Sequence, residues 1–191
     1  MARLVALLLL PALLTLAGCA GGMPGTGTAA SDAQAGSSGK AGPRMVPKIY
    51  RIHPSETATI QFRMLDAVNA LRAAARVGPL QLNARLNAAA ATHSRDMSRQ
   101  NRPWHFGSDG SSPLDRVRRV GYAGALVGET ISETYETELE TLAAWMEEED
   151  TRRVLLDPEA NEMGFAWQQE ASGKIWWTLV LGRGAAAAPA S

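Results

Sequence analysis

The chain of 191 residues has little cysteine and no excess of charge of either sign. Its single cysteine excludes a disulfide within the chain, so the folded part must be stable through its core alone. Lys and Arg total 19, and so do Asp and Glu. Because nucleic-acid binding needs a basic surface, this balance leads us to expect no nucleic-acid partner.

The sequence also lacks a long apolar run at its N-terminus. Residues 4–14 form an apolar run of about 11 residues, too short to span a bilayer and typical of a secretory signal. The run ends in Leu16-Ala17-Gly18-Cys19, which resembles a bacterial lipoprotein signal; an ordinary secretory signal with an incidental cysteine is the alternative. We therefore predict a signal peptide over residues 1–18 and a lipidated Cys19 that attaches the protein to a membrane.

Composition divides the rest of the chain into three parts. Residues 19–44 are rich in Gly, Ala and Ser, and such a segment is predicted to be a flexible tether. A single domain is expected over residues 45–184, followed by a disordered tail over residues 185–191. Ala20, and not an aspartate, follows Cys19, and in a Gram-negative cell this favours the outer membrane, with the domain facing the periplasm.

Hydrophobic periodicity and capping residues predict the secondary structure of the domain. Ser112 and Pro113 form a strong helix start, and Asp150 is expected to cap a short turn after a break in the acidic run. The predicted helices cover residues 58–76, 83–100, 113–121 and 135–148, and the predicted strands cover residues 125–132, 163–167 and 174–182.

The last predicted strand is apolar on both faces. Ile175 and Trp177 alternate with Trp176, so both faces of this strand should be buried. A strand buried on both sides requires helices on both sides of the sheet. We predict an α+β fold, a three-layer α/β/α sandwich.

Several short motifs, taken together, resemble those of the CAP superfamily of cysteine-rich secretory, antigen-five and pathogenesis-related proteins. They are Trp104-His105-Phe106-Gly107, Gly121-Tyr122, Gly128-Glu129-Thr130 and Trp145-Met146. The resemblance implies an α/β/α fold with a cleft lined by His105 and Glu129. It also implies that Glu148, three residues after Trp145, lines this cleft; a place on a solvated acidic helix end is the alternative.

The family's second cleft histidine is absent from this chain. Asp150-Thr151-Arg152 stands where many bacterial members have Gly-His-Arg, and Trp176 stands where eukaryotic members have the histidine. One imidazole and two carboxylates make a poor zinc site, so we expect no metal and no cofactor. Of the other histidines, His93 is expected to be a hydrogen-bonded core residue and His53 a surface residue.

Other polar residues near His105 and Glu129 have simpler explanations than catalysis. Glu129 shares strand parity with Val127 and Ile131, so it should point into a largely apolar layer and need a partner there. Ser112 is needed as a helix cap, so a serine nucleophile is disfavoured. The basic cluster at residues 116, 118 and 119 is expected to be a solvated face, with contact to lipid headgroups as the alternative.

These observations favour an envelope-anchored binding module without catalytic activity. Its ligand would be an apolar small molecule, such as a lipid or sterol-like compound, or an envelope component, with Trp104 as an apolar wall beside His105 and Glu129. The alternative is a hydrolase of peptide or cell-wall material that uses His105 and Glu129 as acid and base. A purely structural His105–Glu129 pair is the third hypothesis.

Overall fold

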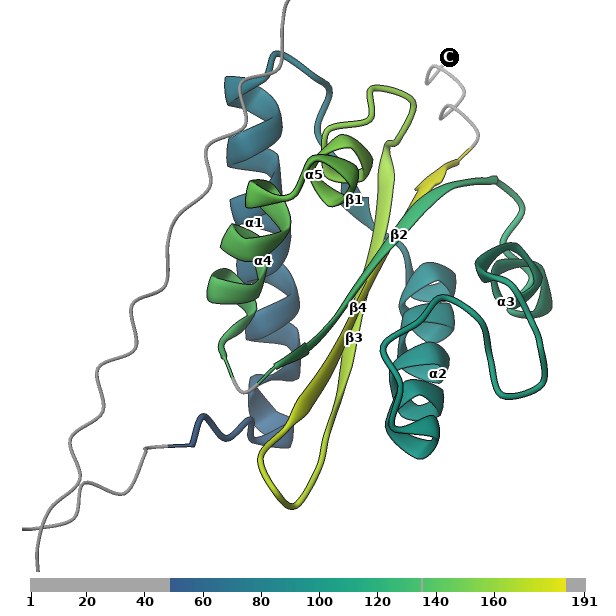
Figure 1. Ribbon diagram of the computed structural model, residues 1–191. Coiled ribbons are helices and arrows are strands. Elements are labelled where there is room, and N and C mark those ends of the chain that lie inside the picture. Colours follow the sequence, from purple (N-terminus) through teal and green to yellow (C-terminus); the bar gives the residue numbers. More distant parts are fainter. Residues whose placement is uncertain (1–48, 135, 185–191) are drawn as a thin grey trace, which may run out of the picture. The chain divides into compact units, whose positions relative to one another are not determined.

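The computed structural model describes residues 49–134 and 136–184 (Figure 1). The predicted signal peptide, Cys19, the tether and the tail over residues 185–191 lie outside the described residues. The helices are η1 (Pro54–Glu56), α1 (Thr57–Ala74), α2 (Ala84–Gln100), α3 (Pro113–Arg119), α4 (Glu138–Glu147) and α5 (Glu149–Leu155). The strands are β1 (Gln81–Leu82), β2 (Ala125–Thr134), β3 (Glu162–Gln169) and β4 (Ile175–Arg183). Within the described ranges, no helix is both long and apolar enough to cross a bilayer.

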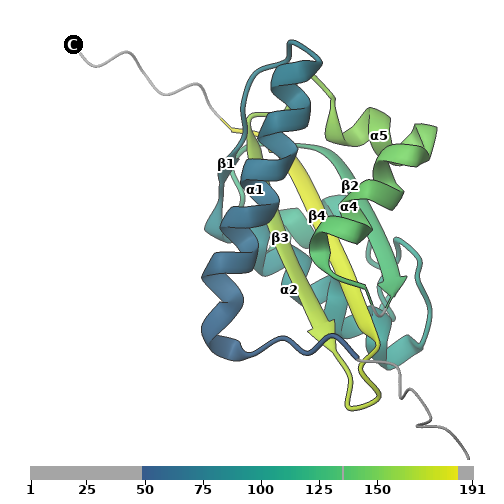
Figure 2. The same ribbon diagram turned by 90° about the vertical axis from the view of Figure 1, so that its left-hand side faces the viewer.

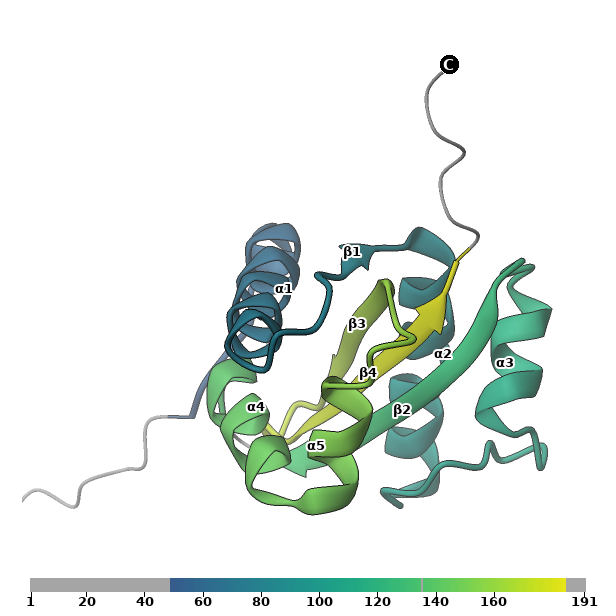
Figure 3. The ribbon, with the colours of Figure 1, turned by 90° about the horizontal axis from the view of Figure 1, so that it is seen from above.

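Helices cover both faces of a four-stranded sheet. The strand order is β1-β3-β4-β2, with β4 antiparallel to both of its neighbours and β1 parallel to β3. Helices α1, α4 and α5 lie on one face, and α2 and α3 lie on the other (Figures 1 and 3). The predicted α+β fold with three layers is confirmed. β1 was not predicted, because two residues are too few to show a periodic pattern.

The central strand β4 is buried on both faces, as its sequence predicts. Ile175, Trp177 and Leu179 pack with residues of α1, α4 and α5, and the ring of Trp177 stacks on Phe165 at 5.4 Å between centroids. Val180 packs with residues of α2 and α3 on the other face. Figure 2 shows α1, α4 and α5 lying across the first of these faces. Burial of large apolar side chains on both faces makes β4 the core of the sandwich.

Side-chain caps position the helices that carry the site. Asn83 accepts hydrogen bonds from the backbone N–H groups of Arg85 and Leu86 at the start of α2. Ser112 caps α3 through a reciprocal box with Asp115, so the predicted helix start at Ser112 and Pro113 is confirmed. The helix predicted over residues 135–148 begins only at Glu138, because Thr137 forms the capping box there; residue 135 lies outside the described residues.

The acidic run does break the helix, but the predicted role of Asp150 is wrong. Glu148 is the residue between α4 and α5, and Asp150 lies inside the first turn of α5. Arg152 Nη1 donates to the carbonyl oxygens of Met146 (2.8 Å) and Glu147 (3.2 Å) at the end of α4. These bonds satisfy carbonyl groups that the end of a helix leaves open, so the chain turns without an aspartate cap.

Helix α2 lies unusually close to strand β3 of the sheet at one point. A Cβ atom on Gly164 of β3 would stand 2.1 Å from the backbone carbon of Leu86 and 2.3 Å from the backbone nitrogen of Asn87. The Asn87 side chain accepts a hydrogen bond of 2.7 Å from the N–H of Phe165. Helix α2 is therefore held directly on β3, and this fixes the depth of the residues that α2 presents to the sheet.

Candidate functional site

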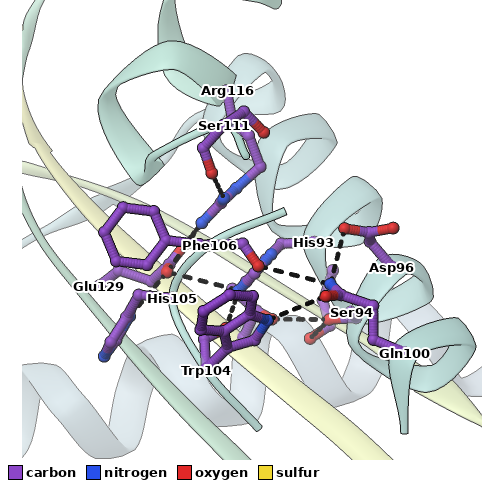
Figure 4. A network of polar contacts seen from close by, with 12 residues as sticks. His93, Ser94, Asp96, Gln100, Trp104, His105, Phe106, Ser111, Arg116 and Glu129 are labelled. Atoms are coloured by element: carbon purple, nitrogen blue, oxygen red, sulfur yellow. Dashed lines mark hydrogen bonds and ion pairs between the residues drawn. The ribbon is translucent and has the colours of Figure 1, made fainter. Parts of the chain in front are cut away.

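The buried carboxylate of Glu129 on β2 is the centre of a polar cluster (Figure 4). Its side chain is 3% exposed. Arg116 Nη2 on α3 donates to both carboxylate oxygens, at 2.9 and 2.8 Å, and His105 Nδ1 lies 2.9 Å from Oε1. The structure thus brings together His105 and Glu129, the two residues that the motifs single out.

A bulge in β2 decides which face Glu129 points to. The pairing with β4 shifts register between Leu126 and Gly128. As a result Val127 packs with α1, α4 and α5, while Glu129 lies opposite Val180 on the α2 side. The predicted shared parity of Val127 and Glu129 is therefore wrong, because a bulge adds a residue to one strand and breaks the alternation.

Arg116 corrects a second prediction, that of a wholly solvated basic face on α3. The residue is 4% exposed, and its Nη1 donates to the backbone oxygen of Ser111 at 3.1 Å. Arg119 pairs with Asp109 at the surface, and Arg118 is exposed. A buried carboxylate needs a counter-charge. Helix α3 provides it, because it places Arg116 against Glu129 of β2.

His93 of α2 is buried and hydrogen-bonded, so its predicted place in the core is confirmed. Its Nε2 lies 3.0 Å from the backbone oxygen of Trp104 and 3.6 Å from Oε1 of Glu129. Since a carbonyl oxygen only accepts, Nε2 carries the proton. Sequence reasoning missed the approach of His93 to Glu129; the signal available was a histidine on the same helical stripe as Leu86 and Met97.

The hydrogen bonds determine the charge states at the centre of the cluster. Burial alone would raise the pKa of Glu129, but the hydrogen bond from His105 and the charge of Arg116 outweigh burial and hold the pKa below its ordinary value. The carboxylate is therefore ionised, and His105 donates its Nδ1–H to it. In a neutral His105 the Nε2 lone pair then has no partner among residues 49–134 and 136–184, and the side chain is 48% exposed.

Protonation of His93 should make the stability of the fold depend on pH. Burial lowers the pKa of His93 below its ordinary value of 6.5, so in the window below that value the unfolded chain binds a proton that the folded chain does not. We expect the free energy of unfolding, measured by urea titration, to fall as pH is lowered from 7 toward 5. A His93→Gln variant should show a flatter dependence, whereas His53→Gln should behave like the parent. Equal slopes in all three proteins would contradict this assignment.

Glu148 is not brought into contact with His105 and Glu129. It is exposed at the junction of α4 and α5, and its carboxylate makes no side-chain hydrogen bond or ion pair within residues 49–134 and 136–184. In the same ranges, no three His, Cys, Asp or Glu side chains are grouped so as to hold a metal ion. The cluster therefore offers charge pairing and hydrogen bonding rather than a set of metal ligands.

Thr151 and Trp176 stand at the two positions where family members carry the second histidine, and here both side chains form hydrogen bonds that stabilise the fold. Thr151 Oγ1 donates to the backbone oxygen of Trp145, which ties α5 to α4. Trp176 Nε1 donates to Oε1 of Glu170 at 2.7 Å, beside the turn between β3 and β4. Neither side chain supplies a further imidazole to the cluster.

The loop after α2 places an aromatic pair next to His105. Trp104 donates from Nε1 to Gln100 Oε1 at 3.0 Å, and the guanidinium of Arg102 lies 3.8 Å from its ring centroid. Phe106 is exposed and lies 5.6 Å from Trp104 between ring centroids. In the described part of the chain, no serine hydroxyl bonds to His105, and Ser108 Oγ instead donates to Asp96 at 2.7 Å. The loop thus presents apolar surface rather than an activated nucleophile.

The sheet lies between two layers of helices, and a histidine in the loop after α2 is paired with a glutamate on β2. These features define a class of compact α/β/α domains. Residues 65–181 match the model of the cysteine-rich secretory protein (CAP) family, and the chain belongs to this family.

Bacterial proteins are among its relatives. The uncharacterized protein YkwD of Bacillus subtilis is 28% identical over 130 residues, which is 68% of this chain and 50% of YkwD. The chain therefore spans about half the length of this relative. An outer surface protein from Borrelia burgdorferi has a similar structure, with a TM-score of 0.63 at 13% identity over 70% of this chain and 97% of that one. An extracellular protein with an SCP domain from Bacillus anthracis gives a TM-score of 0.61 at 21% identity over 70% of this chain and 45% of that one. At these identities the two structures show that the fold is shared.

Proposed function

We propose that the protein is a CAP-domain binding module of the bacterial cell envelope, that it has no catalytic activity of its own, and that it binds an apolar small molecule with a long aliphatic part. One observation carries the proposal. A groove of about 480 Å³ between α1 and α4 is lined by apolar side chains alone, namely Ala67, Ala70, Leu71, Leu139, Leu142, Ala143 and Met146.

The groove suits a chain-like apolar ligand because of its apolar lining and its place between two helices. It runs between two helices that lie side by side on one face of the sheet (Figure 2). Leu139 is 41% exposed at its edge, while Leu142 is buried at its base. An aliphatic chain that covers this groove removes the apolar surface of the groove and of the chain from water. The burial favours binding by about 25 cal/mol per Å² of apolar surface.

The polar cluster on the other face of the sheet supports a non-catalytic role. Both oxygens of the Glu129 carboxylate accept hydrogen bonds, and the pKa of the group is held below its ordinary value, so Glu129 is poorly suited to act as a general acid. The half-buried Trp104 and the exposed Phe106 offer a second apolar surface, which an envelope component could contact. Trp104 and His105 are thus proposed as contact residues for recognition, with the buried Glu129 holding His105 in place.

Titration with a fluorescent long-chain fatty acid tests the proposed groove. We expect saturable binding to the parent and at least about a threefold weaker binding to Leu139→Gln, because the substitution puts an amide where apolar surface is buried. Leu114→Gln is the matched control, since Leu114 is 39% exposed on α3 and does not line the groove. Absence of saturable binding, or an equal effect of both substitutions, would refute the groove as the binding site.

A hydrolase is the second candidate, and the free ring nitrogen of His105 favours it. With Nδ1 held by Glu129, Nε2 faces outward from a half-exposed side chain and could accept a proton from water or a hydroxyl. Assays with peptide and cell-wall substrates would decide. Turnover that falls at least about a hundredfold in His105→Ala would favour the hydrolase; turnover unchanged by that substitution would exclude this mechanism.

The envelope location rests on the N-terminal sequence ending in Cys19. We propose that Cys19 is lipidated after removal of residues 1–18 and holds the domain on the outer membrane, facing the periplasm, if the cell is Gram-negative. In cell fractionation, the parent should stay with the outer membrane. A Cys19→Ala variant should leave that fraction, because it has no thiol to be lipidated. Identical fractionation of the two proteins would contradict lipidation.

A further inference from the structure

A pocket between α2 and α3 is separate from the apolar groove and has the opposite chemistry. It measures about 480 Å³ and is lined from α2 and α3, whereas the groove is lined from α1 and α4. These two pairs of helices lie on opposite faces of the sheet (Figure 3). The charged and hydroxyl groups that matter here are Arg95, Asp96, Arg99, Ser108, Arg116 and Arg119. Four arginines from two helices thus converge on one pocket.

The two acids of this pocket are already committed to other groups. Asp96 accepts hydrogen bonds from the N–H (2.6 Å) and the hydroxyl (2.7 Å) of Ser108. Asp109 pairs with Arg119 and also accepts from the N–H of Ser111 at 2.9 Å. The acids therefore position the loop over residues 108–111 rather than neutralise the arginines of α2.

The arginines of α2 have no carboxylate partner in the described part of the chain. Arg95 makes only a long contact of 3.5 Å to Thr92 Oγ1, and Arg99 makes no side-chain hydrogen bond or ion pair with described residues. Because they are four residues apart, Arg95 and Arg99 lie one above the other on the same helix face, where like charges repel. An anion between them would turn this repulsion into attraction.

Arg116 supplies the second, independent observation. It lines the pocket, it is only 4% exposed, and among the described residues its Nε–H has no hydrogen-bond acceptor. Its two Nη atoms are used by Ser111 and Glu129. A buried donor without an acceptor costs about 1–3 kcal/mol. The Nε atom is closed to solvent, so a ligand oxygen reaches its N–H only when the residues over it shift.

We propose that this pocket binds a phosphate group, either free or as part of a lipid headgroup. Guanidinium groups on two sides match the several oxygens of a tetrahedral phosphate, whereas a carboxylate presents two oxygens in one plane. Arg95 and Arg99 contact the phosphate from α2, and Arg119 contacts it from α3 while its Nη1 stays paired with Asp109. Arg116 lines the same pocket, and a shift of the residues over its Nε–H lets that group donate to the phosphate. Arg116 then joins the bound phosphate to Glu129, so the phosphate site and the polar cluster share one side chain.

The test uses the full chain, inorganic phosphate as the first probe, and vesicles of phosphatidylcholine with or without phosphatidylglycerol as the second. Ionic strength is held constant with chloride, because surface charge attracts any anion at low salt. The Arg95→Ala/Arg99→Ala variant should bind at least about tenfold more weakly than the parent, since two charge-assisted hydrogen bonds are lost. Arg118→Ala/Arg153→Ala removes the same charge from exposed sites outside the pocket and should bind as the parent does.

A spectroscopic readout separates the pocket from general charge attraction. In a ¹H–¹⁵N spectrum of arginine side chains, the Nε–H resonance of Arg116 should shift on phosphate addition and saturate with the binding curve. Saturable binding of inorganic phosphate, lost in the α2 variant, assigns the site to free phosphate. A difference between parent and α2 variant only on phosphatidylglycerol vesicles assigns it to a lipid headgroup. No saturable binding of either probe, or equal losses in both double variants, would overturn the proposal.

Discussion

Replacing Glu129 with Gln should destabilise the fold by about 3–5 kcal/mol, the usual loss when one partner of a buried ion pair is removed. The substitution keeps the shape of the side chain but leaves Arg116 buried without a counter-charge, and it replaces one of the two acceptor oxygens by an NH2 donor that faces Arg116 or His105. Urea titration at pH 7 measures the effect. Glu148→Gln is the matched control, because Glu148 is exposed and should change the free energy of unfolding by less than about 0.5 kcal/mol.

The cost of Glu129→Gln should shrink at low pH. The pKa of Glu129 is lowered in the fold, so its stabilising contribution is present above the ordinary value of 4.5 and is lost as pH falls toward the folded value. Parent and variant should therefore converge in stability below pH 4.5. A variant in which both charges are replaced, Glu129→Gln/Arg116→Met, should recover much of the loss, since no unpaired charge remains. A single-variant loss below about 1 kcal/mol, or no recovery in the double variant, would show that the pair is not what stabilises this face.

Arg72→Met should also destabilise the fold by about 3–5 kcal/mol, because one buried guanidinium bonds four backbone oxygens. The loss is smaller than four charged hydrogen bonds at about 1.5–3 kcal/mol each, since Met avoids the cost of burying a charge. Arg72 is fully buried in α1. It donates to the oxygens of Gly78 (2.7 Å), Leu155 (2.8 Å), Asp157 (3.0 Å) and Ala160 (2.9 Å). Met fills the space of the aliphatic stem but leaves these oxygens without their donor, so the turn after α1 and the turn after α5 lose their connection.

Thermal and urea unfolding of Arg72→Met, Arg72→Lys and the exposed control Arg118→Met would check this prediction. Lysine keeps the charge but has a single nitrogen, so it should recover only part of the stability. Arg118→Met should unfold like the parent. If Arg72→Met and Arg118→Met have the same unfolding midpoint, the four hydrogen bonds do not contribute to stability as described.

Local signals in the sequence were sufficient for the main elements of the fold. The apolar stripes predicted α1 and α2, the Ser112-Pro113 pair predicted the start of α3, and the two apolar faces of β4 predicted helices on both sides of the sheet. Such features depend on neighbours one to four residues apart, and a sequence displays these directly. The motifs likewise predicted that His105 and Glu129 would be found together.

The surroundings of Glu129 were decided by tertiary structure. A bulge at Val127 reverses the expected parity, the packing of α3 buries Arg116, and α2 carries His93 to within 3.6 Å of the carboxylate. The pocket of arginines between α2 and α3 arises in the same way, from two helices that are separate in sequence. By itself, the sequence determined the sandwich, and the resemblance of its motifs to the CAP family implied the pairing of His105 with Glu129. Only the tertiary structure decided which charges share a buried space, because burial and pairing depend on residues that are distant in the chain and on bulges and turns that leave no periodic pattern.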